Sequence, residues 1–524
     1  MHFFPDSSKG RLASLFAVCA IALALPARAD YATPGSGVTW TMEDLVAHSG
    51  GAVTGGGGAY EVHQTVIVSV SDRVSIGPGE RLTFLDTGGV IGLTVRGALS
   101  ALGTEQDPII FDSATAVPGA WRGFVYSDTQ AGSEFHLAWC EIAHANIAVD
   151  IVGADVLVEH CHLHDTLDKV IDFSSANGVV RDCRLVDNRR RTIVMTLSSS
   201  PLIEGCWMEN NNIDNASPYP YVNIGLQGTN SPTIRGCTIL GSNHQMSGGI
   251  AIWNAGAGLI EGNHIEGCGY GILCYQAGAS PAIRGNTLVA NNIHPDTLNW
   301  GFGVACNGNN APVLAGNVIR GQWYGVCAIN GGRPNLGNLE NASPDDDGGN
   351  EIYENGLSRI YGFYNNTALS QMAQGNWWGG ASEQEVEDAI WHQVDDPALG
   401  LVDYSGWLTA SAVGEDGAAP IPERRSHAMV RVYPNPAAGS HASIAFQLPG
   451  DGSGARGASA VDATIFDAAG RVVREWHALP GSSALQVLEW DCADAGGRPL
   501  TGGLYFCKLS VGRQSATARI LLLQ

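Results

Sequence analysis

Charged residues are scarce in this 524-residue sequence, and the basic ones are the scarcest. Only 15% of the residues are charged, and 28 Lys and Arg stand against 51 Asp and Glu, which gives a formal net charge of −23. An acidic surface repels phosphate backbones, so nucleic acid is excluded as a partner. Helical periodicity is also hard to find between residues 60 and 375, which argues against an α-helical protein.

Several motifs of known chemistry are missing as well. The chain has no G-x-S-x-G, no P-loop, no H-E-x-x-H and no C-x-x-C sequence. These absences remove the usual signs of a serine hydrolase, a nucleotide-binding enzyme, a zinc protease and a thioredoxin-like redox protein.

Long apolar runs are confined to the N-terminus. Residues 1–29 have the pattern of a secretory signal peptide, with Lys9 and Arg11 at its basic start, the apolar run Leu12–Leu25 and an A-x-A cleavage site at Ala27–Ala29. No later stretch is long and apolar enough to cross a bilayer. We therefore expect an exported monomer with no transmembrane segment after cleavage.

What the sequence does contain is glycine and a repeat. Gly supplies 68 of the 524 residues. One phrase, a short apolar strand that ends at Gly and is followed by Cys or Asn, recurs at Pro201–Cys206, Pro232–Cys237, Gly258–Asn263, Pro281–Asn286 and Pro312–Asn317. A recurrence roughly every 23 to 31 residues indicates a solenoid.

The last position of the phrase extends upstream as a column: Cys140, Cys161, Cys183, Cys206, Cys237, Asn263, Asn286 and Asn317. The shorter intervals between successive members of this column fit one coil of three short strands. Successive coils would then pair in parallel about 4.8 Å apart. Stacked Asn amides can donate to the next coil, and stacked Cys pack as small apolar side chains. We expect free, buried thiols here, with disulfides between neighbouring coils as the alternative.

A second column places an aromatic residue before a Gly at the start of the next strand: Tyr270, Phe302, Tyr324 and Tyr361. Two arrangements fit this column. The rings stack as a ladder inside the coil, or they form an exposed stripe that binds sugar rings.

Residues 60–408 resemble a right-handed parallel β-helix of the pectin-lyase-like superfamily. Val95–Thr104 with Pro108–Phe111 is similar to the first-coil phrase of such proteins, and Trp121–Phe124 to the strand that follows. Gly375–Gly379 and Asp395–Tyr404 resemble the closing segment of bacterial β-helix proteins. The resemblance implies a fold but no single activity, because this superfamily includes lyases, hydrolases, epimerases and adhesins.

The remainder of the chain divides into a linker and a small all-β module. Residues 413–428 are rich in Gly, Ala and Pro, and residues 429–524 resemble the type A sorting domain of the type IX secretion system, an Ig-like β-sandwich. The matching residues are Tyr433–Pro436, Asp467 with Gly470 and Arg471, Trp490 with Asp491, Gly503–Tyr505 and Ile520–Leu523.

This second resemblance implies the type IX secretion machinery as a partner. It also implies a location outside a Gram-negative-type bacterium, secreted or on the outer cell surface. Cys492 stands where the family usually has Gly, and a disulfide between Cys492 and Cys507 is left open. The expected order is therefore a signal peptide (1–29), a β-helix with an N-terminal cap and a closing Trp377–Trp378 (30–412), a linker (413–428) and a sorting domain (429–524).

Three coils carry insertions at one corner, at residues 214–221, 242–246 and 294–300. Loops stacked at one corner of a solenoid form a wall, and a wall beside a flat sheet makes a groove. Its candidate sugar-binding residues are Tyr219, Tyr221, His244, His294 and Trp300, and its candidate acid and base are Asp214 and Asp296. Ordinary solvent-exposed loops are the alternative.

A further cluster contains His160, His162 and His164 together with Asp165, Asp168, Lys169 and Asp172. Alternate residues of a strand share a face, so a metal site, a catalytic acid–base group or a plain polar face all fit. Backbone positions two residues apart lie about 6.5 Å apart on a strand, which is wide for one ion.

The acidic run Asp345, Asp346 and Asp347 lies in a Gly-rich loop that suits Ca²⁺, although its register does not fit an EF-hand. Ca²⁺ is therefore the one possible cofactor.

Asp214 and Asp296 are expected three coils apart, roughly 14 Å, which exceeds the usual distance between paired glycosidase carboxylates. The sequence thus favours an exported protein that binds polysaccharide or a cell-surface glycan without catalysis. The alternative is a polysaccharide lyase, glycoside hydrolase or epimerase acting on an acidic glycan.

Overall fold

The computed structural model describes residues 30–85, 90–127, 134–225, 227–254, 256–356 and 361–411, followed by shorter segments of the C-terminal region between residues 429 and 523. The signal-peptide prediction (1–29) and the linker prediction (413–428) lie outside the described residues. The chain divides into two compact units, residues 1–412 and 413–524, and each is treated by itself below. Among the described residues, no helix is long and apolar enough to span a membrane.

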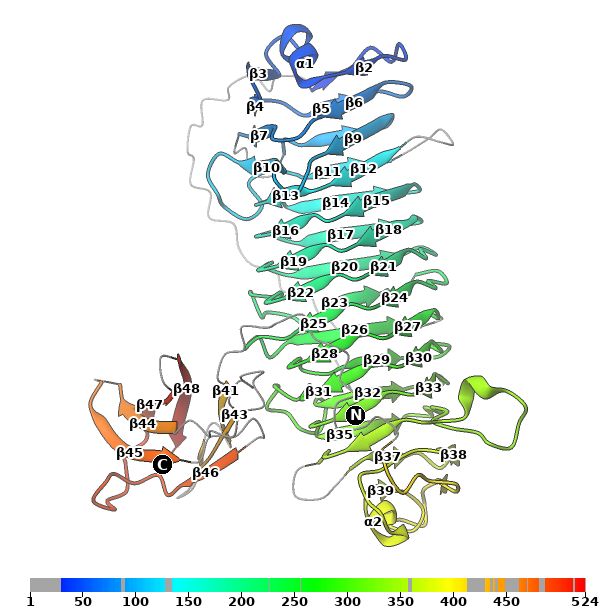
Figure 1. The fold of residues 1–524 in the computed structure, drawn as a ribbon, viewed down its shortest axis with the longest axis vertical. Coiled ribbons are helices and arrows are strands. Elements are labelled where there is room, and N and C mark those ends of the chain that lie inside the picture. Colours follow the sequence, from blue (N-terminus) through cyan, green and yellow to red (C-terminus); the bar gives the residue numbers. More distant parts are fainter. Residues whose placement is uncertain are drawn as a thin grey trace, which may run out of the picture. The chain divides into compact units, whose positions relative to one another are not determined.

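The first unit is a parallel β-helix built from three long sheets (Figure 1). Along the chain each regular coil contributes one strand to sheet I, then one to sheet II and one to sheet III, as β14, β15 and β16 do. Sheet I contains β1 (Tyr31–Ala32), β5 (Val66–Val68), β8 (Leu93–Val95), β11 (Phe124–Tyr126), β14 (Ile147–Val152), β17 (Lys169–Ser174), β20 (Arg191–Thr196), β23 (Tyr219–Ile224), β26 (Ser247–Trp253), β29 (Ile272–Tyr275), β32 (Phe302–Asn307), β35 (Tyr324–Ile329), β37 (Phe363–Asn366) and β39 (Ile390–Trp391).

The other two sheets run beside sheet I for most of its length. Sheet II contains β2 (Thr39–Trp40), β6 (Arg73–Ile76), β9 (Ala98–Leu102), β12 (Phe135–Ala138), β15 (Asp155–Glu159), β18 (Asn177–Arg181), β21 (Leu202–Glu204), β24 (Thr233–Arg235), β27 (Leu259–Glu261), β30 (Ala282–Arg284) and β33 (Val313–Ala315). Sheet III contains β3 (Val53–Gly56), β4 (Ala59–Val62), β7 (Arg81–Phe84), β10 (Ile109–Ser113), β13 (Cys140–Ala143), β16 (His162–His164), β19 (Arg184–Val186), β22 (Trp207–Glu209), β25 (Thr238–Leu240), β28 (His264–Glu266), β31 (Thr287–Val289), β34 (Val318–Arg320) and β36 (Glu351–Tyr353).

The predicted column of Cys and Asn forms a ladder inside the coils. Its five Cys are free and buried, which confirms free thiols over disulfides. Burial raises the pKa of the Cys161 thiol, which disfavours its thiolate form. Further down, the side-chain amide of Asn263 donates to Asn286 at 2.9 Å. The ladder continues beyond the predicted column, because Asn317 donates to Asn350 at 2.8 Å and Asn350 to Asn376 at 2.8 Å.

A left-handed turn precedes this ladder in every coil. The Gly of the repeat phrase has a positive φ, for example 62° at Gly205 and 61° at Gly262. In the upper coils non-Gly residues take the same conformation, with φ of 52° at Trp139, His160 and Asp182. The backbone N–H of each turn donates to the next coil, as His160 does to the Arg181 carbonyl at 3.1 Å. The repeat Gly is therefore set by backbone conformation.

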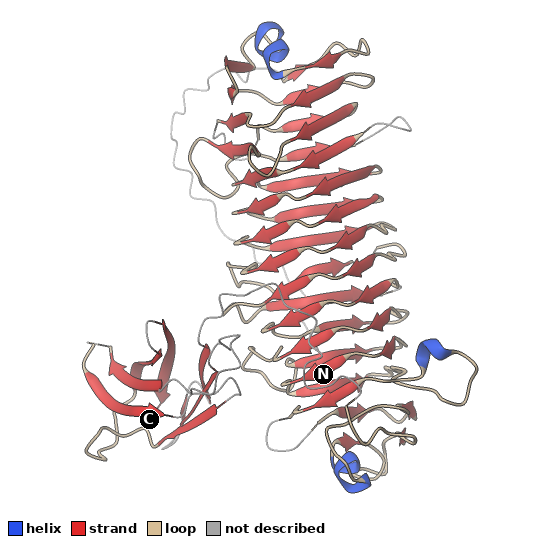
Figure 2. Cartoon of the chain, viewed as in Figure 1, coloured by secondary structure: helices blue, strands red, loops and turns tan. Residues whose placement is uncertain are grey.

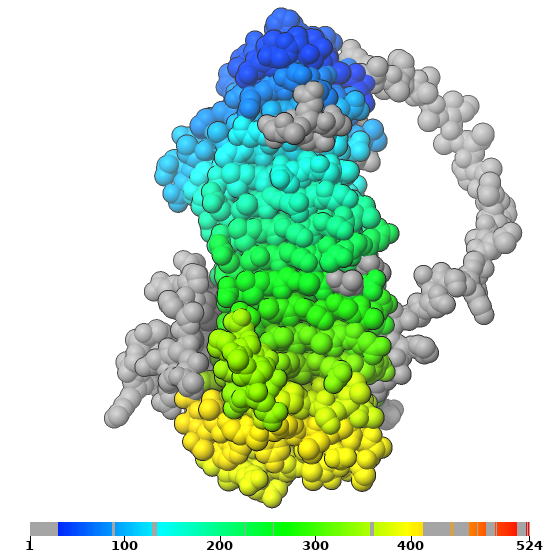
Figure 3. Space-filling model, turned by 90° about the vertical axis from the view of Figure 1, so that its right-hand side faces the viewer, coloured from blue at the N-terminus to red at the C-terminus, as the bar shows by residue number. Residues whose placement is uncertain are grey.

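Both ends of the β-helix are closed by short helices (Figure 2). Helix α1 (Met42–His48) begins at a capping box formed by Thr41 and Asp44, and it buries Met42 and Leu45 against the first coils. At the other end lie α2 (Glu383–Asp388) and a two-stranded sheet of β38 (Gln371–Met372) and β40 (Val402–Asp403). Trp378 is buried there within the main apolar core. The described coils stack closely along the whole length (Figure 3).

The second unit contains two sheets of mostly antiparallel strands. One consists of β41 (Met429–Tyr433), β43 (Ala442–Gln447) and β46 (Gln486–Trp490). The other consists of β42 (Ala437–Ala438), β48 (Gln514–Leu523), β47 (Gly503–Val511), β44 (Val461–Asp467) and β45 (Val472–Leu479). Its core includes Trp490, Tyr505 and Ile520.

Cys492 and Cys507 are both free, so the structure contradicts the disulfide that was left open between them. Cys492 has a φ of 50°, in the left-handed region that favours glycine, and this explains why a Gly would suit the position.

Candidate functional site

The three insertions lie where the chain passes from sheet III to sheet I, between β22 and β23, β25 and β26, and β31 and β32. The first two are joined directly. Met246 donates its backbone N–H to Asn215 Oδ1 at 2.8 Å, and the side chain of Asn212 donates to the Met246 carbonyl at 3.1 Å. They form the beginning of a wall beside the outer face of sheet I.

Asp214 in the first loop is held by basic residues of the coil above. Its carboxylate pairs with Arg189 at 2.8 Å and with Arg190 at 3.2 Å. Tyr219 lies under a third Arg, with the Arg191 guanidinium 4.7 Å from the ring centroid. Asp214 is thus tied into a structural ion-pair network.

Tyr221 does not belong to the groove surface, so its prediction as a sugar-binding residue is wrong. The side chain is 1% exposed and part of the main core. Its hydroxyl donates to the Leu240 carbonyl at 2.8 Å and accepts the Asn211 backbone N–H at 3.1 Å. These bonds place the hydroxyl in a second, internal polar ladder that includes Asn188 and Asn211.

The two loop histidines are partly buried and hydrogen-bonded. His244 Nε2 lies 3.0 Å from Asn210 Oδ1, and burial together with Arg189 lowers its pKa. His294 stacks on Trp300 with 4.3 Å between ring centroids, and burial lowers its pKa as well. Trp300 itself is 9% exposed and packs on Tyr270, so it fixes the loop against sheet I.

Asp296 organises its own loop. It accepts the Leu298 backbone N–H at 3.0 Å and the Asn299 side-chain amide at 2.7 Å. Burial acts to raise the pKa of Asp296, but these hydrogen bonds outweigh it and the pKa is lowered. Asp214 precedes β23 and Asp296 precedes β32, three strand steps further along sheet I, so the two carboxylates are not brought together.

The aromatic column faces the outside of sheet I. Tyr270, Phe302 and Trp300 belong to an apolar cluster that is separate from the main core, and Trp253, Tyr275, Tyr324 and Tyr364 pack against it partly exposed. The internal ladder, one of the two arrangements that the sequence allowed, is therefore not formed. We call this cluster, together with Tyr361 and Trp391, the aromatic face.

A local shift in hydrogen bonding explains this orientation. The consecutive backbone N–H groups of Gly325 and Val326 both donate to the next coil, to Tyr361 and Gly362. Two adjacent donors pointing the same way break the alternation of the strand, as in a β-bulge. Tyr324 consequently faces outward although Val326, two residues later, faces the core.

The rings of the aromatic face contact one another across several coils. Ring centroids are 5.4 Å apart for Phe302 and Tyr324, 5.2 Å for Tyr324 and Tyr364, and 6.3 Å for Tyr364 and Trp391. From β26 to β39 the aromatic face crosses six strands, a length of about 24 Å at the usual strand spacing.

A pair of carboxylates lies higher on the same face, and only one of its members, Asp172, was named from the sequence. Asp150 on β14 and Asp172 on β17 are direct neighbours in the sheet register. Lys169 binds Asp172, and Arg191 pairs with Asp168 at 3.0 Å. Burial, and secondly the charge of Asp172, raise the pKa of Asp150. The 22-residue spacing of Asp150 and Asp172, one coil, was the signal that could have revealed the pair.

The predicted His triplet is divided by the structure. His160 occupies the left-handed turn and stacks on Trp139 at 4.6 Å, so it is not available to the other two. His162 and His164 lie on the outer face of sheet III, with ring centroids 4.4 Å apart. The third residue beside them is Glu141 from the preceding coil. The backbone spacing overestimates the distance between the rings of His162 and His164, because the two rings lean toward each other.

The carboxylates of the acidic loop, which are the possible Ca²⁺ ligands, make separate contacts. Asp345 pairs with Arg284 at 3.3 Å, while Asp346 accepts from Asn335 at 2.7 Å and from Asn341 at 3.0 Å. Asp345 and Asp346 lie in a short 3₁₀ helix (Pro344–Asp346), and Asp347 follows it. Within the described residues, these carboxylates do not converge with a third ligand.

The two hollows of note lie away from the predicted groove. One of about 440 Å³ in the second unit is lined by residues that include Asp467, Arg471 and Tyr505. Another of about 360 Å³ in the first unit is lined by residues that include Asn310 and Arg333.

Comparison with known proteins places the first unit among right-handed β-helices. Residues 208–342 match the family model described as "Right handed beta helix region". This match and the parallel sheets confirm the predicted right-handed β-helix. No curated protein matches the sequence.

Solved structures share only general features with the chain. A point mutant of the periplasmic alginate epimerase AlgG is 12% identical over 71% of this chain and 84% of its own, with a TM-score of 0.34. Bacteriophage CBA120 tailspike protein 4 is 11% identical over 84% of this chain and 59% of its own, with a TM-score of 0.31.

PorZ, a type IX secretion component of Porphyromonas gingivalis, is 18% identical over 18% of this chain, with a TM-score of 0.14. The chain spans 11% of PorZ and 9% of PorU from the same organism. These similarities carry no functional inference.

Proposed function

We propose that this protein is exported and binds a polysaccharide along the outer face of sheet I. The observation that carries the proposal is the aromatic face, a row of rings outside the core that follows the solenoid axis for about 24 Å. Aromatic rings combine a broad apolar face with, in Tyr, a polar hydroxyl, which suits the mixed surface of a sugar ring. A row of such rings on an open sheet fits a chain of sugars.

Tyr324 and Tyr364 occupy the centre of this face. They lie on adjacent strands, their ring centroids are 5.2 Å apart, and both remain partly exposed. The wall loop of His294 and Trp300 packs on Tyr270 and borders the same face. We assign sugar stacking to Tyr324 and Tyr364, and the shaping of the groove edge to Trp300.

The test is a binding screen with the full chain against neutral and acidic polysaccharides, with and without Ca²⁺. Tyr324→Ala and Tyr364→Ala should each weaken binding of the polysaccharide that the wild type selects by at least tenfold. Tyr353→Ala is the matched control, because Tyr353 contacts Trp377 on the outer face of sheet III. Equal binding by all three variants, or no binding of any polysaccharide by the wild type, would refute the proposal.

Catalysis on an acidic glycan is the second candidate, and the pair Asp150 and Asp172 favours it. Neighbouring strands place the backbones of Asp150 and Asp172 about 4.8 Å apart, so that both carboxyl groups can approach one glycosidic bond, as in retaining glycosidases. A raised pKa suits Asp150 to donate a proton, while Asp172 forms an ion pair with Lys169.

Incubation of the selected polysaccharide with the full chain, followed by measurement of new reducing or unsaturated ends, tests this second candidate. The Asp150→Asn variant should abolish any product, and the Asp214→Asn variant should retain it. Binding without product would leave the sugar-binding proposal in place and exclude the enzyme.

The remaining proposals concern export. We infer that residues 1–29 direct the chain out of the cytoplasm and that the second unit is an Ig-like sorting domain read by the type IX secretion machinery. The two sheets of that unit and the matching phrase around Trp490 and Asp491 support this inference. Deletion of residues 429–524 should then retain the protein in the periplasm of a host with this secretion system.

A further inference from the structure

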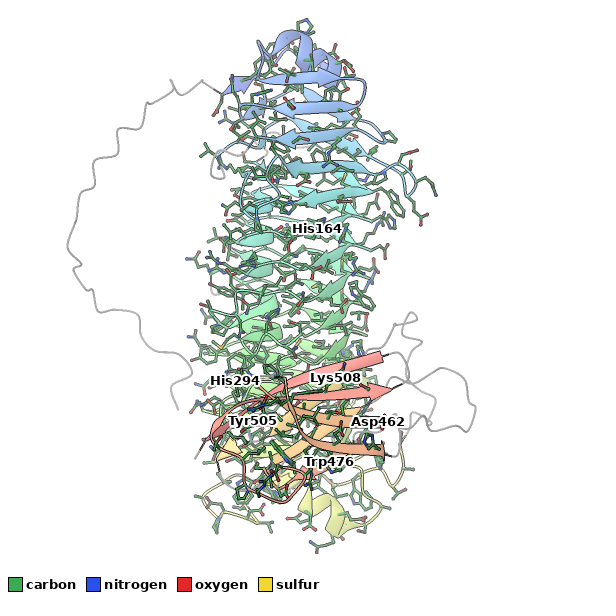
Figure 4. The ribbon with its side chains drawn as sticks, turned by 90° about the vertical axis from the view of Figure 1, so that its left-hand side faces the viewer. His164, His294, Asp462, Trp476, Tyr505 and Lys508 are labelled. Atoms are coloured by element: carbon green, nitrogen blue, oxygen red, sulfur yellow. The ribbon has the colours of Figure 1, made fainter. Side chains whose placement is uncertain are left out.

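Three metal-ligating side chains converge on the outer face of sheet III, away from the proposed sugar site. Glu141 lies on β13, and His162 and His164 lie on β16 of the next coil. Glu141 and His162 are direct neighbours in the sheet register. One ligand atom from each of the three side chains lies within 4.8 Å of the other two. His164 is labelled in Figure 4, well above His294 along the solenoid.

One ring nitrogen of His162, Nε2, is buried without a hydrogen-bond partner among the described residues. A buried polar atom without a partner costs about 1–3 kcal/mol, so such an atom calls for an explanation.

His164 is already oriented as a ligand. Its Nδ1 lies 2.8 Å from Asp165 Oδ2, and its Nε2 lies 3.5 Å from Glu141 Oε1. A carboxylate on the second nitrogen fixes the ring and raises its basicity, as is usual for histidines that bind metals. The His164 side chain is 18% exposed and that of Glu141 is 41% exposed, so an ion can enter from solvent.

We propose that Glu141, His162 and His164 bind one Zn²⁺ ion. Two imidazoles and one carboxylate form a zinc donor set that leaves the fourth tetrahedral position to water. Ligand atoms around tetrahedral Zn²⁺ lie about 3.4 Å apart, so the side chains need to close by at most about 1.4 Å. Because the ligands come from two coils, the ion joins β13 to β16.

The chain supplies a matched control on the same face. His264 lies further down the same row of sheet III, and its Nε2 contacts Glu266 at 2.9 Å. This pair has the same chemistry, but no third ligand joins it among the described residues. A substitution at His264 therefore tests whether binding needs the three-ligand cluster or merely a surface histidine.

The experiment uses the full chain, stripped with a chelator and titrated with Zn²⁺ and with Co²⁺. We expect one Zn²⁺ to bind per chain and to raise the Tm. Bound Co²⁺ should give visible absorption bands with the intensity of a tetrahedral ion that has nitrogen and oxygen ligands. His162→Gln and Glu141→Gln should each weaken Zn²⁺ binding at least tenfold and remove the Tm shift. Asp165→Asn should weaken Zn²⁺ binding by a smaller factor. His264→Gln, the control, should leave both binding and the Tm shift unchanged.

Each outcome decides the proposal. The absence of stoichiometric Zn²⁺ binding by the wild type would overturn it, and so would binding that survives in Glu141→Gln and His162→Gln. Binding lost in His264→Gln would assign the ion to another place and overturn it too. Two independent ligand variants are included so that poor folding of one, judged by circular dichroism, still leaves the other as a test.

Discussion

The side-chain amide of Asn286 donates to Asn317 Oδ1 at 3.0 Å, and the Asn286 backbone N–H donates to the same oxygen at 2.9 Å. One amide oxygen thus joins two coils through two hydrogen bonds. Asn286 in turn accepts the same pair of bonds from Asn263, at 2.9 and 3.0 Å. Each Asn of the ladder is therefore both a donor to one coil and an acceptor from the other.

Replacing Asn286 with Ala should destabilise the β-helix by about 2 kcal/mol or more, because the change leaves two donors of Asn263 without their acceptor in the core, at about 1–3 kcal/mol each. The urea midpoint of the β-helix transition measures the effect. Asn341→Ala, in an exposed loop, is the control and should cost less than about 1 kcal/mol. A similar loss in both variants would contradict the role of the ladder.

Stability should fall at alkaline pH because of the buried thiols. Burial raises the pKa of Cys268, so the folded state disfavours its thiolate. This contribution is complete below the unfolded pKa of about 8.5 and is lost above it, at up to about 1.4 kcal/mol per pH unit for each thiol. The Tm of Cys268→Ala, measured from pH 7 to 10 under reducing conditions, should decline less steeply than that of the wild type.

Burial of the thiols should also lower their reactivity. The described chain contains eleven cysteines, all free and buried. A thiol reagent such as DTNB should leave them unreacted in the native protein at pH 8 and should modify all of them in denaturant. Rapid modification of the native protein would show that some of these thiols are open to solvent.

The fold could be predicted from the sequence because its ladder repeats one phrase in one register. The Cys and Asn column, from Cys140 to Asn317, marks the same corner of every coil and reveals the period directly. The second ladder was missed, because its members change type: Asn211, Tyr221, Asn291 and Gln322 carry equivalent bonds through different side chains.

The candidate site was harder to predict because it depends on which side of a strand a residue faces. Tyr324 faces outward only because two consecutive N–H groups, at Gly325 and Val326, shift the alternation. Asp150 and Asp172 meet only through the register of β14 and β17. His160 carries a metal-ligand side chain, yet the left-handed turn directs it to Trp139. Composition does not reveal such details.

Asp150→Asn should stabilise the protein at pH 7. Because burial and Asp172 raise the pKa of Asp150, the folded state prefers its protonated form. The stabilising contribution is complete below the unfolded pKa of about 3.9 and is lost as the pH rises through the folded pKa, so the charge is a cost at pH 7. We expect Tm to rise by roughly 1–2 °C, as is usual for a change below about 1 kcal/mol in a chain of this size.

Two comparisons check this prediction for Asp150. The gain in Tm should shrink when the measurement is repeated at progressively lower pH, because the raised pKa of Asp150 favours protonation of the wild-type carboxyl in the folded state. Asp172→Asn removes the partner of Lys169 and should give no gain at pH 7. Equal gains at both pH values would mean that the effect comes from packing and not from charge.

Two glycines with positive φ should respond very differently to alanine. Gly262 has a φ of 61° with no described atom within 4 Å of an added Cβ, so Gly262→Ala should cost only the strain of a left-handed residue, about 1–2 kcal/mol. Gly123 has a φ of 96°, and an added Cβ would lie 1.7 Å from the Ile147 carbonyl oxygen. Gly123→Ala therefore has to displace β14 and should cost several kcal/mol more.

Asp182→Gly should change stability in the opposite direction at the equivalent turn of another coil. Asp182 adopts the conformation of the repeat Gly, with a φ of 52°, so glycine should relieve its strain and leave stability unchanged or higher by up to about 1 kcal/mol. Urea denaturation of Gly262→Ala, Gly123→Ala and Asp182→Gly gives the comparison. Similar losses of stability in Gly262→Ala and Gly123→Ala would show that backbone strain outweighs the carbonyl contact. A large loss of stability in Asp182→Gly would show that the turn depends on the Asp side chain.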